Sequence, residues 1–173
     1  MLGNWIRGAD KPRAGTNRFL RTTLDRFDVS RNRWLAISLF DYQSRDSTRV
    51  EARGVYKTLC SMGDLRTLAL DRCNTLPFIL TLNPQKNSSK TVLCPKLEKI
   101  ILYVERSNQL HVEVLMSMAE QRASRGAQLP AITIVSTEAL APTKEVFRLR
   151  RHVLCVEYKF DDASPKWDAL PVT

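Results

Sequence analysis

The residues best suited to chemistry are two histidines, and their neighbours do not favour a catalytic site. His111 has Glu113 close by along the chain, and His152 precedes the acidic pair Asp161-Asp162. A histidine beside a carboxylate can act as a general acid or base, but catalysis also needs a nucleophile or acceptor and a pocket that holds both. The sequence does not organise such a pocket, so we expect His111 to have a surface or helix-capping role.

The cysteines and the common catalytic motifs support the same expectation. The four cysteines stand at positions 60, 73, 94 and 155, without a C-x-x-C pair that would suggest zinc or redox chemistry. The chain also lacks a glycine-rich phosphate loop and a G-x-S-x-G motif. We therefore expect no enzyme activity, no bound metal and no cofactor, and we interpret the cysteines as small buried apolar residues.

Composition and charge restrict the class of protein further. The chain has 173 residues, of which 43% are hydrophobic, so we expect one domain with a real core. Its net charge of +9 permits an acidic protein or a nucleic acid as partner. We expect no membrane segment, because no apolar run has the necessary length. The first residues lack a secretory signal, so the expected location is cytoplasmic or nuclear, with reduced thiols.

A repeated pattern of apolar residues indicates the elements that position these side chains. The pattern L-x-x-L-x-L-x-x-C occupies Leu65, Leu68, Leu70 and Cys73. Its echoes start at positions 34, 97, 129 and, more weakly, 153, so the successive steps are 31, 32, 32 and 24 residues. A nearly fixed period of this kind is typical of stacked repeats. The matching triads are Trp34-Ile37-Leu39, Leu97-Ile100-Leu102, Leu129-Ile132-Ile134 and Val153-Val156-Tyr158.

The fold predicted from this period is an α/β, leucine-rich-repeat-like solenoid with parallel strands on the concave side and helices on the convex side. Each triad gives a strand, and the intervening segments carry helical patterns, most clearly over residues 111–125. The alternative is an ordinary α/β domain whose strands and helices happen to alternate regularly. We expect a flexible N-terminal arm over residues 1–16, the repeat domain over 17–160, and a tail or cap over 161–173.

The candidate protein-binding residues are the strand positions that alternate with the core positions. Successive side chains of a strand point to opposite faces, so residues between the core leucines should line the concave face. Phe40, Ile101 and Tyr103 would form an apolar, aromatic centre that could anchor a partner. In the alternative interpretation, a neighbouring segment covers this face and the sheet is buried on both sides. The candidates are Ser38, Phe40, Ala69, Asp71, Ile101, Tyr103, Thr133, Val135, Glu157 and Lys159.

Several stretches between residues 60 and 170 carry a resemblance to a known family. They include residues 65–73, 76–84, 118–126 and 156–168, and the joint Cys94-Pro95-Lys96-Leu97 that precedes a predicted strand. This part of the chain resembles the C-terminal leucine-rich-repeat region of fungal F-box-type proteins. The resemblance implies a substrate receptor of a ubiquitin ligase, in which the F-box binds a Skp1-type adaptor and the repeats bind the target protein.

The chain departs from that family in one respect. No Leu-Pro-x-Glu opening of an F-box precedes residue 60, so a Skp1-type adaptor is a doubtful partner, and we expect the chain to act through a protein target. The alternative function is a basic repeat module that associates with nucleic acid. It rests on basic residues in the N-terminal third and on Lys144, Arg148, Arg150 and Arg151 near the C-terminus.

Overall fold

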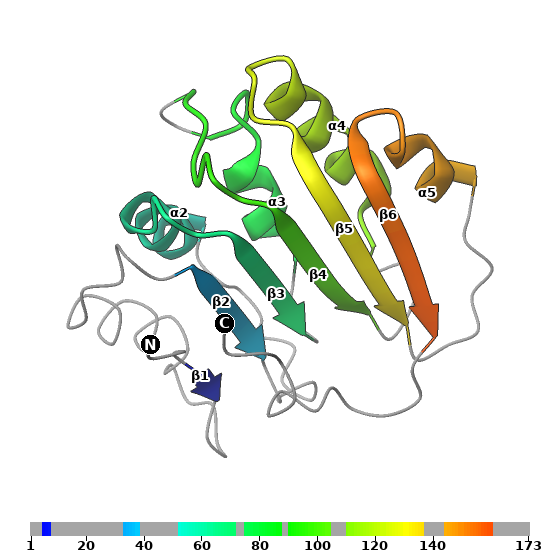
Figure 1. Cartoon of the computed structure of the whole chain (residues 1–173). Helices are drawn as coiled ribbons and strands as arrows, with labels where there is room; N and C mark the ends of the chain where they lie inside the picture. The colour runs from blue at the N-terminus through cyan, green and yellow to red at the C-terminus, as the bar shows by residue number, and fades with distance from the viewer. Residues whose placement is uncertain are drawn as a thin grey trace.

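The strands lie side by side in the order in which they occur along the chain. The computed structural model describes residues 5–7, 33–38, 52–71, 75–87, 90–104, 110–136 and 144–160. Within these ranges the strands form one sheet of order β1-β2-β3-β4-β5-β6, and every neighbouring pair is parallel (Figure 1). The strands are β1 (Trp5–Arg7), β2 (Trp34–Ser38), β3 (Thr67–Asp71), β4 (Lys99–Val104), β5 (Leu129–Ser136) and β6 (Val153–Phe160).

Four helices connect successive strands from β2 onward. They are α2 (Ala52–Ser61), α3 (Leu76–Leu82), α4 (Val112–Ala123) and α5 (Lys144–Leu149). Each helix contacts the next, and Figure 1 shows them in a row behind the sheet, in the same order as the strands. Pro77 lies in the first turn of α3, where its missing N–H costs nothing. Gly126 follows α4 with φ +74°, a left-handed conformation that favours glycine.

The core lies between the helices and one face of the sheet. Leu65, Leu68 and Leu70 are fully buried there, and the equivalent residues of the next two triads are also buried. The first residue of each triad comes before side chains begin to alternate regularly between the two faces of the sheet. The other two residues are two positions apart, so they point to the same side of the strand. The L-x-x-L-x-L pattern therefore predicted the buried side chains of β3, β4 and β5 correctly.

The predicted register of the first triad was wrong by two residues. Trp34 pairs with Thr67 and not with Leu65, and Leu35 pairs with Leu68. Leu35 and Ile37 consequently occupy the buried positions that the sequence pattern assigned to Ile37 and Leu39. The pattern misled because Trp34 resembles the apolar residue that opens a triad, whereas it packs with apolar side chains on the opposite face. Paired residues of β2 and β3 are thus 33 positions apart in the sequence, and not 31 as predicted.

The N-terminal segment contributes a strand that the sequence pattern did not indicate. Trp5–Arg7 form β1, within the range expected to be an arm, and pair with Ala36 to Ser38 of β2. A strand of three residues offers too short an alternation for a period to be read from it. The predicted tail over residues 161–173 lies outside the described residues.

A buried arginine joins α4 to the loop that precedes β4. Arg122 of α4 is fully buried, and its guanidinium donates hydrogen bonds to the carbonyl oxygens of Leu93 (2.7 Å) and Cys94 (3.0 Å). Cys94 has φ +48°, a strained conformation for a residue with a side chain. Its thiol donates a hydrogen bond to the Leu59 carbonyl at 3.4 Å. These contacts hold the strained loop between two helices and the sheet.

The described residues therefore form an α/β fold in which all the helices cover one face of a parallel sheet. Among these residues, no helix is both long enough and apolar enough to cross a bilayer. The opposite face of the sheet carries the side chains that alternate with the core positions.

Candidate protein-binding face

The face of the sheet opposite the helices, called here the helix-free face, is built from three rows of residues. Parallel pairing in register places equivalent residues of neighbouring strands side by side, so each row crosses the sheet at right angles to the strands. The first row is Trp34, Thr67, Lys99, Ala131 and Cys155; the second is Ala36, Ala69, Ile101, Thr133 and Glu157; the third is Ser38, Asp71, Tyr103, Val135 and Lys159.

The middle of this face carries an apolar cluster contributed by β2, β3, β4 and β5. Ala36, Ala69, Ile101 and Val135 form a buried cluster that is separate from the main core. Trp34 and Tyr103 pack against this cluster and are only partly buried. Small alanines beside large aromatic side chains produce an uneven apolar surface, and partly exposed aromatic residues are frequent anchors in protein interfaces.

Beside this cluster, Thr133 of β5 with Glu157 and Lys159 of β6 form a polar group that contains a hydrogen-bonded carboxylate. The Thr133 hydroxyl donates a hydrogen bond to Oε2 of Glu157 at 3.1 Å, and Lys159 Nζ lies 3.4 Å from the same oxygen. The hydrogen bond from Thr133, followed by Lys159 and the charge of Lys99, lowers the pKa of Glu157 below its ordinary value. Glu157 is therefore held in its charged form beside the apolar cluster.

The candidate residues of this face differ in how accessible they are. Ala69, Ile101, Thr133 and Val135 are buried, so the centre of the helix-free face is largely closed to solvent. Tyr103 and Glu157 are half-buried, and Lys159 is exposed. Ser38 and Asp71 lie in the third row, where nothing is described of their side chains, and Phe40 lies outside the described residues. The accessible candidates are thus Tyr103, Glu157 and Lys159.

Sequence reasoning missed the first row of the helix-free face, whose members are half-buried or exposed. Trp34 and Lys99 are its two largest half-buried side chains, and they lie on either side of Thr67. Trp34 was overlooked because the shifted register treated it as a core position. Lys99 was overlooked because the prediction assigned residues to this face only after the second residue of each triad. In the triad Leu97-Ile100-Leu102, the first residue assigned to the face was therefore Ile101. Alternation read one step further toward the start of the strand would have identified Lys99, whereas Trp34 also required the correct register of β2.

The described histidines and cysteines have separate places in the fold, apart from Cys60 and Cys94, which interact electrostatically. His111 immediately precedes α4, and His152 lies in the turn between α5 and β6, where its carbonyl accepts a hydrogen bond from Gln128. Cys94 is buried, and burial raises its pKa to about 12. Cys60 and Cys155 are exposed, contrary to the interpretation of them as buried apolar residues. Cys73, Asp161 and Asp162 lie outside the described residues.

No potential metal site is formed by the described part of the chain, where His, Cys, Asp and Glu side chains nowhere gather in groups of three or more. The fold places the chain among α/β proteins with a parallel sheet whose strands follow chain order. Neither a family model, nor a curated protein, nor a solved structure matches the chain. The resemblance to fungal F-box-type proteins therefore stays a prediction.

Proposed function

We propose that this chain is a protein-recognition module, a leucine-rich-repeat-like solenoid that binds a target protein through its helix-free face. One observation carries the proposal: all four described helices cover one face of an in-order parallel sheet, and a separate apolar cluster lies on the other face. Repeat proteins built in this way commonly bind partners along the sheet. The resemblance to the target-binding repeats of F-box receptors points to the same kind of function.

The contacts available to a partner are an aromatic group and a charged group next to it. Trp34 and Tyr103 offer large, partly exposed rings, which are enriched among the residues that dominate binding energy. Glu157 and Lys159 offer paired charges at the edge of the apolar area. Such charges contribute more to specificity and to the rate of association than to affinity.

The experiment that tests this function compares two half-buried tyrosines on opposite sides of the molecule. Tyr103 packs on the helix-free face, and Tyr56 of α2 packs against the helix-side core. The immobilised chain is incubated with nuclease-treated extract of its source cells, and the retained proteins are quantified by mass spectrometry. Tyr103→Ala should reduce a retained target by about tenfold or more, whereas Tyr56→Ala should leave it nearly unchanged.

The salt dependence of binding separates a protein target from a nucleic acid. A target held by an apolar face should remain bound in moderate salt, whereas binding through phosphates weakens steeply as salt rises. Equal retention by the two tyrosine variants would contradict the proposed face. Retention that occurs only in a parallel incubation with untreated extract, and that disappears in moderate salt, would favour the basic nucleic-acid module. The proposal concerns target binding alone, since no F-box opening occurs before residue 60.

A further inference from the structure

The last described unit, formed by α5 and β6, carries three exposed large apolar side chains. Among the described residues, the large apolar side chains with high exposure are Phe147 (51%), Leu154 (74%) and Phe160 (59%). Phe147 belongs to α5, and the other two belong to β6. An exposed group of this kind often marks an interaction site in a soluble protein.

The outer edge of β6 has no strand partner among the described residues. This strand is the last in the sheet order, and within the described ranges it pairs with β5 on one side only. Natural edge strands are usually protected by charged side chains, prolines or short length. β6 has eight residues and no proline, and its only charged residues are Glu157 and Lys159 in its second half. In its first half, Leu154 stands at the register position that Arg66 and Glu98 hold just before β3 and β4 and that Pro130 holds in β5. The edge is therefore weakly protected against an additional strand.

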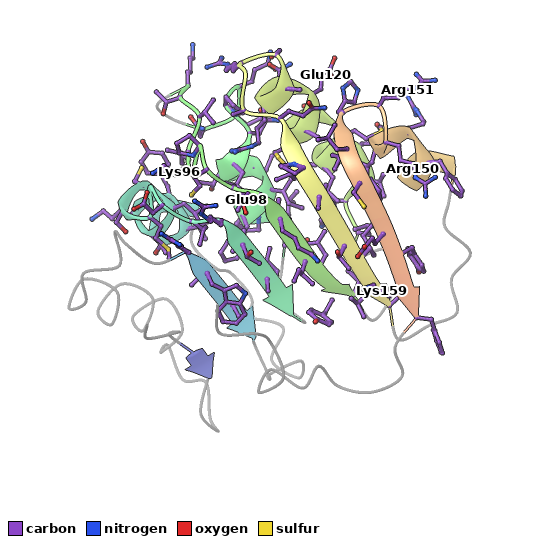
Figure 2. The ribbon with its side chains drawn as sticks, viewed as in Figure 1. Lys96, Glu98, Glu120, Arg150, Arg151 and Lys159 are labelled. Carbon is purple, nitrogen blue, oxygen red and sulfur yellow. The ribbon has the colours of Figure 1, made fainter. Side chains whose placement is uncertain are left out.

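The charges around this edge are mostly positive. Residues 144–160 contain five lysines and arginines and two glutamates, which gives a net charge of +3. Arg150 lies over the Phe147 ring, with 5.3 Å between its Cζ atom and the ring centroid. Figure 2 shows Arg150 and Arg151 at the end of the molecule formed by α5 and β6, and Lys159 near the carboxyl end of β6. Cations thus lie near both ends of the strand.

We propose that the outer edge of β6 binds an extended, acidic segment of a partner protein as an additional strand. Backbone hydrogen bonds to the edge give affinity, and alternating side chains give specificity, as in other cases of strand addition. Apolar side chains of the segment cover Leu154 and Phe160, and its carboxylates lie near Arg150 and Arg151. A second copy of this chain fits less well, because its net charge of +9 repels an identical molecule.

This surface goes beyond the proposed function, because it lies at the sheet edge and not on the helix-free face. The probes are three fluorescent peptides of about twelve residues: alternating Val and Glu, alternating Val and Lys, and the Val-Glu peptide with a central proline. Fluorescence anisotropy should show that the Val-Glu peptide binds at least about tenfold more tightly than the other two. Hydrogen exchange should show that this peptide protects the amides of β6.

Charge-reversal variants locate the peptide on the molecule. Arg150→Glu combined with Arg151→Glu should weaken binding of the Val-Glu peptide by about tenfold or more. The matched control, Lys57→Glu with Lys86→Glu, makes the same change in net charge at exposed sites in α2 and after α3, and should leave binding close to wild type. Tyr103→Ala should not affect the peptide, so the two proposed surfaces can fail independently.

Several results would overturn the assignment of the edge. They are no binding of the Val-Glu peptide, equal binding of the proline-containing peptide, an equal loss in both charge-reversal variants, or protection of amides outside β6. Sedimentation velocity adds a further test. Self-association of the chain that blocks the peptide would assign the edge to a second copy.

Discussion

Arg122 shows how one buried side chain can join a helix to the loop that precedes a strand. It is fully buried and donates to the carbonyl oxygens of Leu93 and Cys94, while its Nε has no hydrogen-bond partner in the structure. Burial lowers the pKa of Arg122, because removal from water disfavours the charged form. Burial of the charged guanidinium therefore lowers the stability of the fold, and the two hydrogen bonds to carbonyl groups offset part of that loss.

We predict that Arg122→Ala lowers the free energy of unfolding by about 3–5 kcal/mol, because it removes the hydrogen bonds to the Leu93 and Cys94 carbonyl groups, of which that of Cys94 keeps only the bond from the Leu97 N–H, and creates a cavity. Urea denaturation measures this change. Arg125→Ala is the control: Arg125 also donates to a loop carbonyl, that of Lys90, but is exposed, so the expected loss is within about 0.5 kcal/mol. Equal losses in the two variants would show that Arg122 does not hold the loop.

Glu157 should titrate below its ordinary pKa, because the Thr133 hydroxyl and the Lys159 ammonium favour the carboxylate. A lowered pKa in the folded state means that this contribution to stability is present above about pH 4.5 and is lost as the pH falls through the lowered value. An NMR titration of the side-chain carboxyl carbon should give a midpoint below 4.5. Thr133→Val should raise that midpoint, because it removes the hydroxyl that donates to Glu157. The control Thr81→Val removes a hydroxyl of α3 and should leave the midpoint unchanged. An unchanged midpoint in Thr133→Val would refute the hydrogen bond.

At the residue scale, the sequence predicted side-chain direction better than accessibility. The alternation within each triad placed Ile101 and Tyr103 opposite the core, in agreement with the second apolar cluster. It could not predict that Ile101 is buried while Tyr103 is partly exposed, because exposure depends on side chains from neighbouring strands. The exposed thiols of Cys60 and Cys155 were missed for the same reason.

At the element scale, the repeat period brings charged residues of successive units together. Lys96 Nζ lies 2.6 Å from Oδ1 of Asp64, and Arg66 Nη1 lies 2.5 Å from Oε1 of Glu98. Both pairs join residues 32 apart, which equals the offset between β3 and β4. The hydrogen bond from Lys96 lowers the pKa of Asp64. Figure 2 shows Lys96 and Glu98 on the loop that leads into β4.

We predict that Lys96→Glu lowers the urea midpoint of unfolding, since it places two acidic side chains together. Adding Asp64→Lys to this variant should restore part of the loss, so the double variant should be more stable than the sum of the single changes indicates. The coupling should decrease in 1 M NaCl, because both side chains are exposed. Simple additivity at low salt would show that the two residues do not interact across units.

The strands and helices were predicted correctly where the sequence of one strand–helix unit resembles that of the next unit. The triads over 65–70, 97–102 and 129–134 gave three strands correctly, and the helical stripe over 111–125 matches α4. The register of β2 was not predictable from spacing, because Trp34 resembles a core residue and only its packing assigns it to the other face. β1 is too short to produce a pattern.

At the scale of the whole molecule, strand order implies that stability varies across the sheet. β3, β4 and β5 each have partners on both sides, whereas β6, within the described ranges, has one. We predict that amides of β6 exchange with solvent at least about tenfold faster than those of β4, measured by native-state hydrogen exchange. Equal protection of the two strands would show that the edge of β6 is already covered in the free protein.

The period predicted the order and the direction of the strands, because units that repeat in one direction must connect parallel strands. It did not predict the apolar exposure of the last unit. That feature arises because Phe160 occupies the position of the buried Ser136 of β5, while β6 has no described strand beyond it. Side-chain identity at the end of a sheet therefore carried information about exposed apolar surface that the spacing alone did not.

The most direct test of the proposed recognition face is a lysine footprint of the chain with its retained target. Lys99 lies on the helix-free face and Lys57 on α2, among the helices. Modification by an amine-reactive reagent is quantified by mass spectrometry with and without the target. If the target binds the helix-free face, we expect it to slow modification of Lys99 and to leave the rate of modification of Lys57 unchanged. Protection of Lys57 with Lys99 still fully reactive would contradict it.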